Sequence, residues 1–276
     1  SSSNFAINLE GRATSNLLLE GSISGILSES SVYNIVNDIT IDAGDTLLIQ
    51  PNVQLLFYEG AKFQVNGYIN AQGSSSDRII MRPYNSEEYW GGLKFGSSSD
   101  SNSVFEYVTI YGSNDAGIAL EGANMNMSYL NISGNQTSTR NGAGIYANSS
   151  SLVLNNITMV NNHYLGEGNE GAGGMYLDNS DISIINSIIW ENSGNSLIRL
   201  SDENTSLSLA FSNLDQSLIL NNNDKVEIED LFGSFLEFGT GGLRGIMGVG
   251  TNRINQYTIQ TVSEGLSRII EGKLIP

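Results

Sequence analysis

The sequence contains no cysteine, a single histidine and only three prolines among its 276 residues. Without cysteine, neither a disulfide bond nor a thiolate metal site can form. The lone histidine, His163, excludes a metal centre built from several histidines of one chain. With proline so scarce, the turns of the chain must come mainly from other residues, and glycine is abundant with 31 copies.

Positive charge is also scarce. Lys and Arg number 12 against 29 Asp and Glu, which gives a net charge of −17 and a pI near 4.2. A chain of this charge repels nucleic-acid phosphates and anionic lipids, so no nucleic-acid partner is expected. No apolar run approaches the ~20 residues that cross a bilayer, so no membrane insertion is expected.

A four-residue motif, Gly-apolar-x-apolar, recurs along the middle of the chain. Its glycines lie at 92, 117, 144 and 174, and are therefore spaced by 25, 27 and 30 residues. Alternation of apolar residues with a middle position that points outward is typical of short β-strands. The four copies are Gly92-Leu93-Lys94-Phe95, Gly117-Ile118-Ala119-Leu120, Gly144-Ile145-Tyr146-Ala147 and Gly174-Met175-Tyr176-Leu177.

A second pattern follows the first in step, as "FEYVTI", "SYLNIS", "LNNITM", "INSIIW" and "FSNLDQ". We expect its aligned apolar residues to form one inward column of side chains. Asparagines of the same pattern are expected at the corners, where stacked amides can bond along a ladder. The expected column is Val108, Ile132, Ile157, Ile188 and Leu214, and the expected corner residues are Asn131, Asn156 and Asn213.

Two interlocked motifs with a variable period near 25 residues predict a coil of constant circumference. One turn cannot bury its own apolar face, but stacked turns bury a continuous core. The fold class is therefore predicted to be all-β, a parallel β-helix that the handedness of parallel crossovers makes right-handed. At least seven stacked coils are expected between residues 34 and 225.

The run "AGDTLLIQPNVQLLF" and the repeats "NNITMVNN" and "INSIIWEN" resemble the pectin-lyase-like right-handed parallel β-helix family over residues 30–230. The resemblance implies a secreted or cell-surface bacterial protein, although the chain shows no signal peptide. We assign residues 1–233 to this β-helix domain. The repeats specify the coil rather than the activity, so function has to be argued from sites.

Two tyrosines occupy the outward position of the Gly-apolar-x-apolar motif on adjacent turns. Tyr146 and Tyr176 are therefore expected to stack on a flat sheet, with Lys94 two turns from Tyr146. Stacked aromatic side chains can serve as a platform for a sugar, which makes a polysaccharide or cell-surface glycan the candidate partner. The alternative is cross-strand packing that only stabilises the sheet.

Two long insertions, 133–144 and 161–174, fall at equivalent corners of successive turns and are expected to lie side by side. They would gather Arg140, His163, Glu167 and Glu170. Such a cluster could serve a polysaccharide lyase or a glycoside hydrolase, which need a base or a pair of carboxylates. The alternative is a set of ordinary solvated loop residues.

The stretch "LEFGTGGLRGIMGVGTNRINQYTIQTVSEGL", within residues 235–271, differs from everything before it. It resembles the N-terminal loop and first helix of the α-D-phosphohexomutases, the phosphoglucomutase and phosphomannomutase family. The resemblance implies that Arg244 would approach a sugar phosphate and that Thr240 and Gly241 would shape the loop. Glycine-rich backbone and a guanidinium also suit an anion on physical grounds.

The family's phosphoserine loop and metal-binding aspartates do not occur in this sequence, and a mutase of this family needs the phosphorylated serine as donor and Mg²⁺ to neutralise the phosphoryl group. We therefore expect no mutase activity, no cofactor and no metal. Residues 234–276 are assigned to a mutase-like fragment, with a helix over 252–271 that caps the solenoid.

Three interpretations of function are open at this stage. The first is a structural, adhesive or glycan-binding β-helix without a complete catalytic site. The second is a lyase or hydrolase of the β-helix type, so that enzymatic activity is undecided. The third is a non-functional phosphohexomutase fragment joined to a β-helix.

Overall fold

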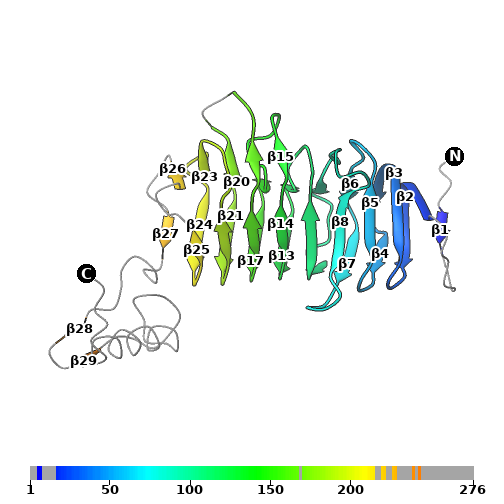
Figure 1. Cartoon of the computed structure of the whole chain (residues 1–276), viewed down its shortest axis with the longest axis horizontal. Helices are drawn as coiled ribbons and strands as arrows, with labels where there is room; N and C mark the ends of the chain where they lie inside the picture. The colour runs from blue at the N-terminus through cyan, green and yellow to red at the C-terminus, as the bar shows by residue number, and fades with distance from the viewer. Residues whose placement is uncertain are drawn as a thin grey trace, which may run out of the picture.

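A computed structural model describes residues 5–7, 17–167, 170–214, 219–221, 226–228, 238–239 and 242–243. Within these residues the protein is all-β, contains no helix and forms a parallel β-solenoid (Figure 1). Each turn passes through three strands, and the same strand of successive turns pairs in parallel, so the solenoid has three faces. Seven such turns follow one another between residues 39 and 214.

The first face carries the Gly-apolar-x-apolar motif and is called face 1. Its strands pair in chain order. They are β6 (Phe63–Val65), β9 (Leu93–Phe95), β12 (Ile118–Glu121), β16 (Ile145–Asn148), β20 (Ala172–Asp178), β23 (Ser196–Leu200) and β26 (Ile219–Asn221).

The chain passes from each face 1 strand to face 2 and then to face 3. Face 2 consists of β4 (Thr46–Ile49), β7 (Tyr68–Gln72), β10 (Val104–Glu106), β13 (Asn124–Ser128), β17 (Ser151–Asn155), β21 (Asp181–Ile185), β24 (Ser206–Ala210) and β27 (Val226–Ile228). Face 3 consists of β5 (Gln54–Phe57), β8 (Ile79–Pro83), β11 (Val108–Tyr111), β14 (Asn131–Ser133), β18 (Thr158–Val160), β22 (Ile188–Trp190) and β25 (Asn213–Leu214).

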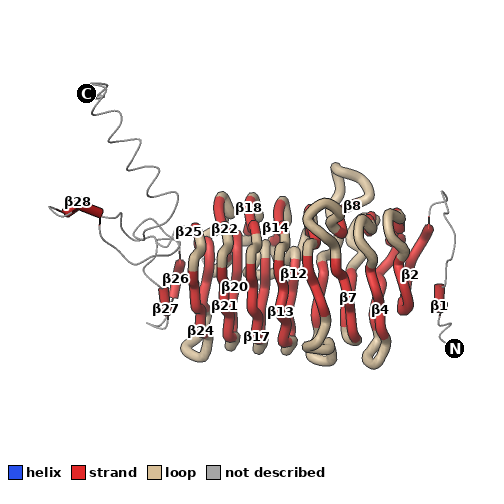
Figure 2. Tube along the Cα trace, turned by 90° about the horizontal axis from the view of Figure 1, so that it is seen from below, coloured by secondary structure: helices blue, strands red, loops and turns tan. Residues whose placement is uncertain are grey.

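The solenoid begins with longer strands that bend around corners. β2 (Leu17–Leu27) and β3 (Val32–Ile41) each contribute to more than one face, and β1 (Phe5–Ile7) pairs with the end of β2. A separate parallel pair joins β15 (Gln136–Thr137) to β19 (His163–Tyr164), and β28 (Phe238–Gly239) pairs antiparallel with β29 (Gly242–Leu243). Figure 2 shows the repeated turns as strands linked by short loops.

Inward side chains alternate with outward ones along the strands and fill one continuous core. The early turns use aromatic residues, and Phe57 stacks on Trp90 with ring centroids 4.2 Å apart. The later turns use Ile, Leu and Met. Because each turn covers the apolar surface of its neighbour, burial stabilises the stack rather than any single turn.

The corners are built from residues with a positive φ, which turns the chain from one face to the next within one residue. Between faces 2 and 3 this position is held by Tyr107, Tyr129, Asn156, Asn186 and Phe211, with φ between 51° and 55°. The left-handed region is unfavourable for a bulky side chain and best tolerated by Asn and Gly. The five residues therefore occupy equivalent positions in successive turns, although three of them are aromatic.

These corners correct the predicted register. The pairing aligns Ile110, Ile132, Met159, Ile189 and Leu214 as the inward column, so Val108, Ile157 and Ile188 were wrongly placed. Ile188 in fact points outward and is 47 % exposed. The predicted register aligned the apolar residues with one another, whereas the observed register counts from the left-handed corner residue, which is not always apolar.

The asparagine ladder exists, but at a different corner. Asn131 and Asn213 lie within strands, and of the three predicted corner asparagines Asn156 alone occupies a corner. The ladder is formed by Asn135, Asn162 and Asn192, which are buried at the corner between faces 3 and 1. The side-chain amide of Asn135 donates to Oδ1 of Asn162 at 2.8 Å, and that of Asn162 donates to Oδ1 of Asn192 at 2.7 Å.

The predicted boundary near residue 233, the expected helix over 252–271 and its capping role lie outside the described residues. The described residues include no helical segment that could span a bilayer.

Candidate functional site: a groove on face 1

The outward positions of face 1 form a single row along the solenoid axis. Strand pairing places Thr40, Gln64, Lys94, Ala119, Tyr146, Tyr176 and Arg199 on successive turns. This confirms that the two tyrosines are neighbours and that Lys94 lies two turns from Tyr146. The row is polar or amphipathic at every position except Ala119.

Loops from the corner between faces 3 and 1 border this row. The two long insertions lie side by side as predicted, because β15 pairs with β19 and Gly142 bridges to Ala172 (Figure 1). Gly142 packs directly against face 1: an added Cβ would lie 2.9 Å from the backbone nitrogen of Tyr176. The first insertion therefore reaches over the outer surface of the sheet.

Arg140, on this insertion, is the centre of an ion-pair network. Its Nη1 donates to Oε1 of Glu121 at 2.8 Å, and its Nε lies 2.7 Å from Oδ1 of Asp115 in an ion pair that lacks hydrogen-bond alignment. The other oxygen of Glu121 is 2.5 Å from Nζ of Lys94. We call these four residues, Asp115, Arg140, Glu121 and Lys94, the Arg140 bridge.

The bridge shifts the ionisation of its members. Burial raises the pKa of Glu121, but hydrogen bonds from Lys94 and Arg140 outweigh burial and hold that pKa below its ordinary value. Burial lowers the pKa of Arg140, but Asp115 and Glu121 outweigh it and raise the pKa above its ordinary value. Both groups are therefore firmly charged at neutral pH.

The guanidinium of Arg140 also lies over the ring of Tyr146, 5.1 Å from its centroid. On the next turn Tyr176 stacks against Tyr146 with centroids 5.9 Å apart and planes inclined by 5°. Burial raises the pKa of the Tyr146 hydroxyl. Since Arg140 and Tyr176 engage the ring faces of Tyr146, this residue offers its edge and hydroxyl to a ligand. Tyr176 is itself buried, at 8 % exposure.

Stacked tyrosines alone do not mark a site in this protein. Tyr58 stacks on Tyr84 and Tyr107 on Tyr129, at 4.7 Å and 4.3 Å, as neighbours along a corner. What distinguishes Tyr146 is its position beneath Arg140 and within a hollow of the surface.

The remaining members of the predicted loop cluster do not join Arg140 among the described contacts. His163 pairs in register with Gln136, and its Nδ1 is 2.6 Å from Oγ of Ser193. Glu167 and Glu170 are exposed. The structure instead brings Arg140 to two carboxylates that the sequence analysis did not single out.

Those two carboxylates flank the Gly-apolar-x-apolar motif. Asp115 lies two residues before Gly117, and Glu121 directly follows Leu120. A search for charged residues at the ends of the face 1 strands would have found both, since strand ends and corner loops of adjacent turns are neighbours in a solenoid.

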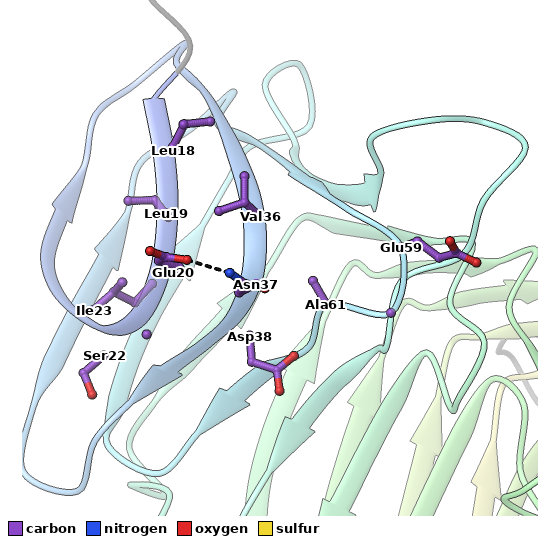
Figure 3. Close-up of a pocket in the computed structure, with 12 residues that line it drawn as sticks. Leu18, Leu19, Glu20, Ser22, Ile23, Val36, Asn37, Asp38, Glu59 and Ala61 are labelled. Atoms are coloured by element: carbon purple, nitrogen blue, oxygen red, sulfur yellow. Dashed lines mark hydrogen bonds between the residues drawn. The ribbon is translucent and has the colours of Figure 1, made fainter.

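Three cavities follow one another along face 1 and its corner with face 3, and neighbouring cavities share lining residues. We call the combined hollow the face 1 groove. The N-terminal cavity, of about 940 Å³, is lined by residues that include Glu20, Asp38 and Glu59 (Figure 3). The middle cavity, of about 210 Å³, shares Asp38 with it and reaches Lys94 and Arg140. The third, of about 380 Å³, lies beside Arg140 and Tyr146.

The ionisation of Glu121 and Arg140 does not suit either of these two residues to acid–base catalysis. A glycosidase acid must hold its proton at neutral pH, which calls for a raised carboxyl pKa, whereas that of Glu121 is lowered. A lyase base must lose a proton, whereas the pKa of Arg140 is raised. Among the described residues, no group of three or more acidic or imidazole side chains is placed to hold a metal ion.

Thr240, Gly241 and Arg244, which the sequence analysis linked to phosphate, lie outside the described residues. Comparison with curated proteins finds 44 % identity over 48 residues with the phosphopentomutases of Homo sapiens and Mus musculus. The match covers 17 % of this chain and 8 % of each relative.

No family model matches the chain, and no solved structure is significantly similar to it. Since the chain spans only about a twelfth of the mutases it matches, their activity is not carried over to it.

Proposed function

We propose that the protein is a glycan-binding β-solenoid that acts outside the cell or on its surface, in a structural or adhesive role. The observation that carries this proposal is the Arg140 bridge over Tyr146 within the face 1 groove. The groove runs along the solenoid axis, which suits an extended polymer better than a compact metabolite.

The groove offers the kind of contacts that sugars need. Hydroxyl, amide and charged groups at Thr40, Gln64, Lys94 and Arg140 can exchange hydrogen bonds with polyols. The ring of Tyr146 supports the guanidinium of Arg140 and so fixes its position. The bridge holds these groups in place before a ligand arrives, which reduces the entropy lost on binding. Small-molecule sites commonly combine a concave surface with a few fixed polar groups.

The proposal is tested by presenting the whole chain to a panel of soluble glycans: xylan, galactan, mixed-linkage glucan, homogalacturonan and chitin oligosaccharides. We expect binding to at least one, measured by calorimetry, and at least tenfold weaker binding by the Tyr146→Ala variant, or about 1.4 kcal/mol. The matched control is Tyr68→Ala, which removes an outward tyrosine from face 2. Absence of binding across the panel, or equal losses in both variants, would overturn the proposal.

A further inference from the structure

The Arg140 bridge crosses the full width of face 1. Asp115 lies on the corner loop that enters β12, and Glu121 is the last residue of β12. A single guanidinium contacts both carboxylates, so the bridge runs along the outside of this strand, from one edge of the face to the other. Ala119, the outward residue of the same strand, is correspondingly buried at 3 % exposure.

The bridge therefore divides the groove. The middle cavity lies on one side, over Thr40, Gln64 and Lys94 of the preceding turns, and the third cavity lies on the other, beside Tyr146. Asp115 and Arg140 line both cavities, as a shared wall must. The middle cavity in turn opens toward the larger N-terminal cavity, with which it shares Asp38.

Opening this wall would be unfavourable. The side chains of Arg140 and Asp115 are 23 % and 22 % exposed, so their charges are largely removed from water. Separation of a partly buried ion pair leaves charges without partners, which costs more than separation of an exposed pair. A polymer that continued along the floor of the groove would have to displace Arg140 from both carboxylates and from Tyr146, or rise over the bridge and lose contact with the floor.

We infer that the face 1 groove is closed at Arg140 and holds the terminal residue of a glycan chain rather than an internal segment. The inference rests on the proposed function and specifies how the ligand is recognised. The middle cavity, at about 210 Å³, is smaller than the ~300 Å³ at which pockets for drug-sized ligands begin, and suits a single monosaccharide-sized group. Lys62, Lys94 and Arg140, with Asp38 and Asp115, would bond its hydroxyls.

The test counts binding sites on intact and fragmented polymer. The panel glycan that binds is partly hydrolysed, and intact and fragmented samples are compared at equal mass by calorimetry with the whole chain. If the groove holds chain ends, the sites per gram rise by the same factor as the number of ends. If internal segments bind, sites per gram stay constant, and the inference is overturned while glycan binding itself stands.

Variants of the Arg140 bridge test whether it is the bridge that closes the groove. Arg140→Ala is expected to open the groove, so that sites per gram become independent of chain length. Glu121→Gln retains the contact of Arg140 with Asp115 and serves as the milder variant if Arg140→Ala does not fold. Arg82→Ala, which removes an outward arginine from face 3, should behave like the unaltered protein. End-dependent binding that persists in Arg140→Ala would contradict the assignment to Arg140.

Discussion

Arg140 lies over the ring of Tyr146 while it bonds to Glu121 of the preceding turn, so one side chain joins two turns of the solenoid across their outer surface. Contacts of this kind depend on neighbours that are far apart in sequence. The contacts of Arg140 therefore affect both the stability of the stacked turns and the binding of a ligand in the groove.

Adjacent isoleucines on β22 test the register. Ile189 is fully buried in the inward column, whereas Ile188 points outward. Ile189→Ala should lower the free energy of unfolding by about 3 kcal/mol, since it leaves a cavity in the core. Ile188→Ala, the same chemical change one residue away, should alter it by no more than ~0.5 kcal/mol. Chemical denaturation of both variants measures the difference, and the reverse order would support the register read from sequence.

The asparagine ladder should be costly to interrupt. Asn162 accepts bonds from Asn135 and donates to Asn192 and to the backbone oxygen of Ile132 at 3.0 Å. Asn162→Ala leaves buried polar groups without partners, so we expect a loss of about 3 kcal/mol in the free energy of unfolding. Asn126→Ala, on the exposed side of β13, is the control and should be nearly neutral. A loss equal to that of the control would mean that the amides contribute nothing.

The Arg140 bridge predicts a specific dependence on pH. The pKa of Glu121 is lower in the folded chain than in the unfolded chain. Its stabilising contribution is therefore complete above the ordinary glutamate pKa of about 4.3 and is lost as pH falls through the lower folded value. The Tm of Glu121→Gln should approach that of the unaltered protein as pH falls below ~4. Above pH 5 the free energies of unfolding of the two proteins should differ by at most about 1 kcal/mol, because the ion pair is partly exposed.

A constant difference between the two proteins from pH 3 to 7 would contradict the ionic role assigned to Glu121. Addition of salt at neutral pH gives an independent check. Screening should reduce the difference between the unaltered protein and Glu121→Gln, since the bridge is reached by solvent on one side.

The mutase-like stretch is expected to be inactive as an enzyme. The 276 residues do not include the phosphoserine loop and metal-binding aspartates that a phosphohexomutase uses as phosphoryl donor and Mg²⁺ site. We expect no conversion of glucose 1-phosphate to glucose 6-phosphate with Mg²⁺ and the bisphosphate activator. Turnover that disappears in Arg244→Ala would show that the segment retains catalytic function.

The sequence predicted the solenoid, its parallel pairing and the alignment of the Gly-apolar-x-apolar motif, because glycine marks the same corner in each copy. It misplaced Val108, Ile157 and Ile188 because the corner between faces 2 and 3 uses Tyr, Asn or Phe in the left-handed conformation, so no single residue type reveals the register. Positions such as Tyr107 and Asn156 become equivalent only once the pairing is known.

The candidate site was also predicted only in part, because some of its contacts depend on how the chain folds. Tyr146, Tyr176 and Lys94 follow from motif spacing, and the nearness of the two insertions follows from their equivalent positions. The partners of Arg140 do not follow, because loop length alone does not determine whether an arginine turns toward His163 or back across β12. That choice depends on Ala119, whose small side chain leaves room over the strand.

The central claim is that a glycan lies in the face 1 groove, and amide hydrogen exchange with and without a saturating glycan from the panel tests it most directly. We expect slower exchange in residues 58–62, 112–121 and 134–146, which border the groove, and no change in face 2 strands such as β13 and β17. Protection confined to faces 2 or 3, or no protection at saturation, would contradict it.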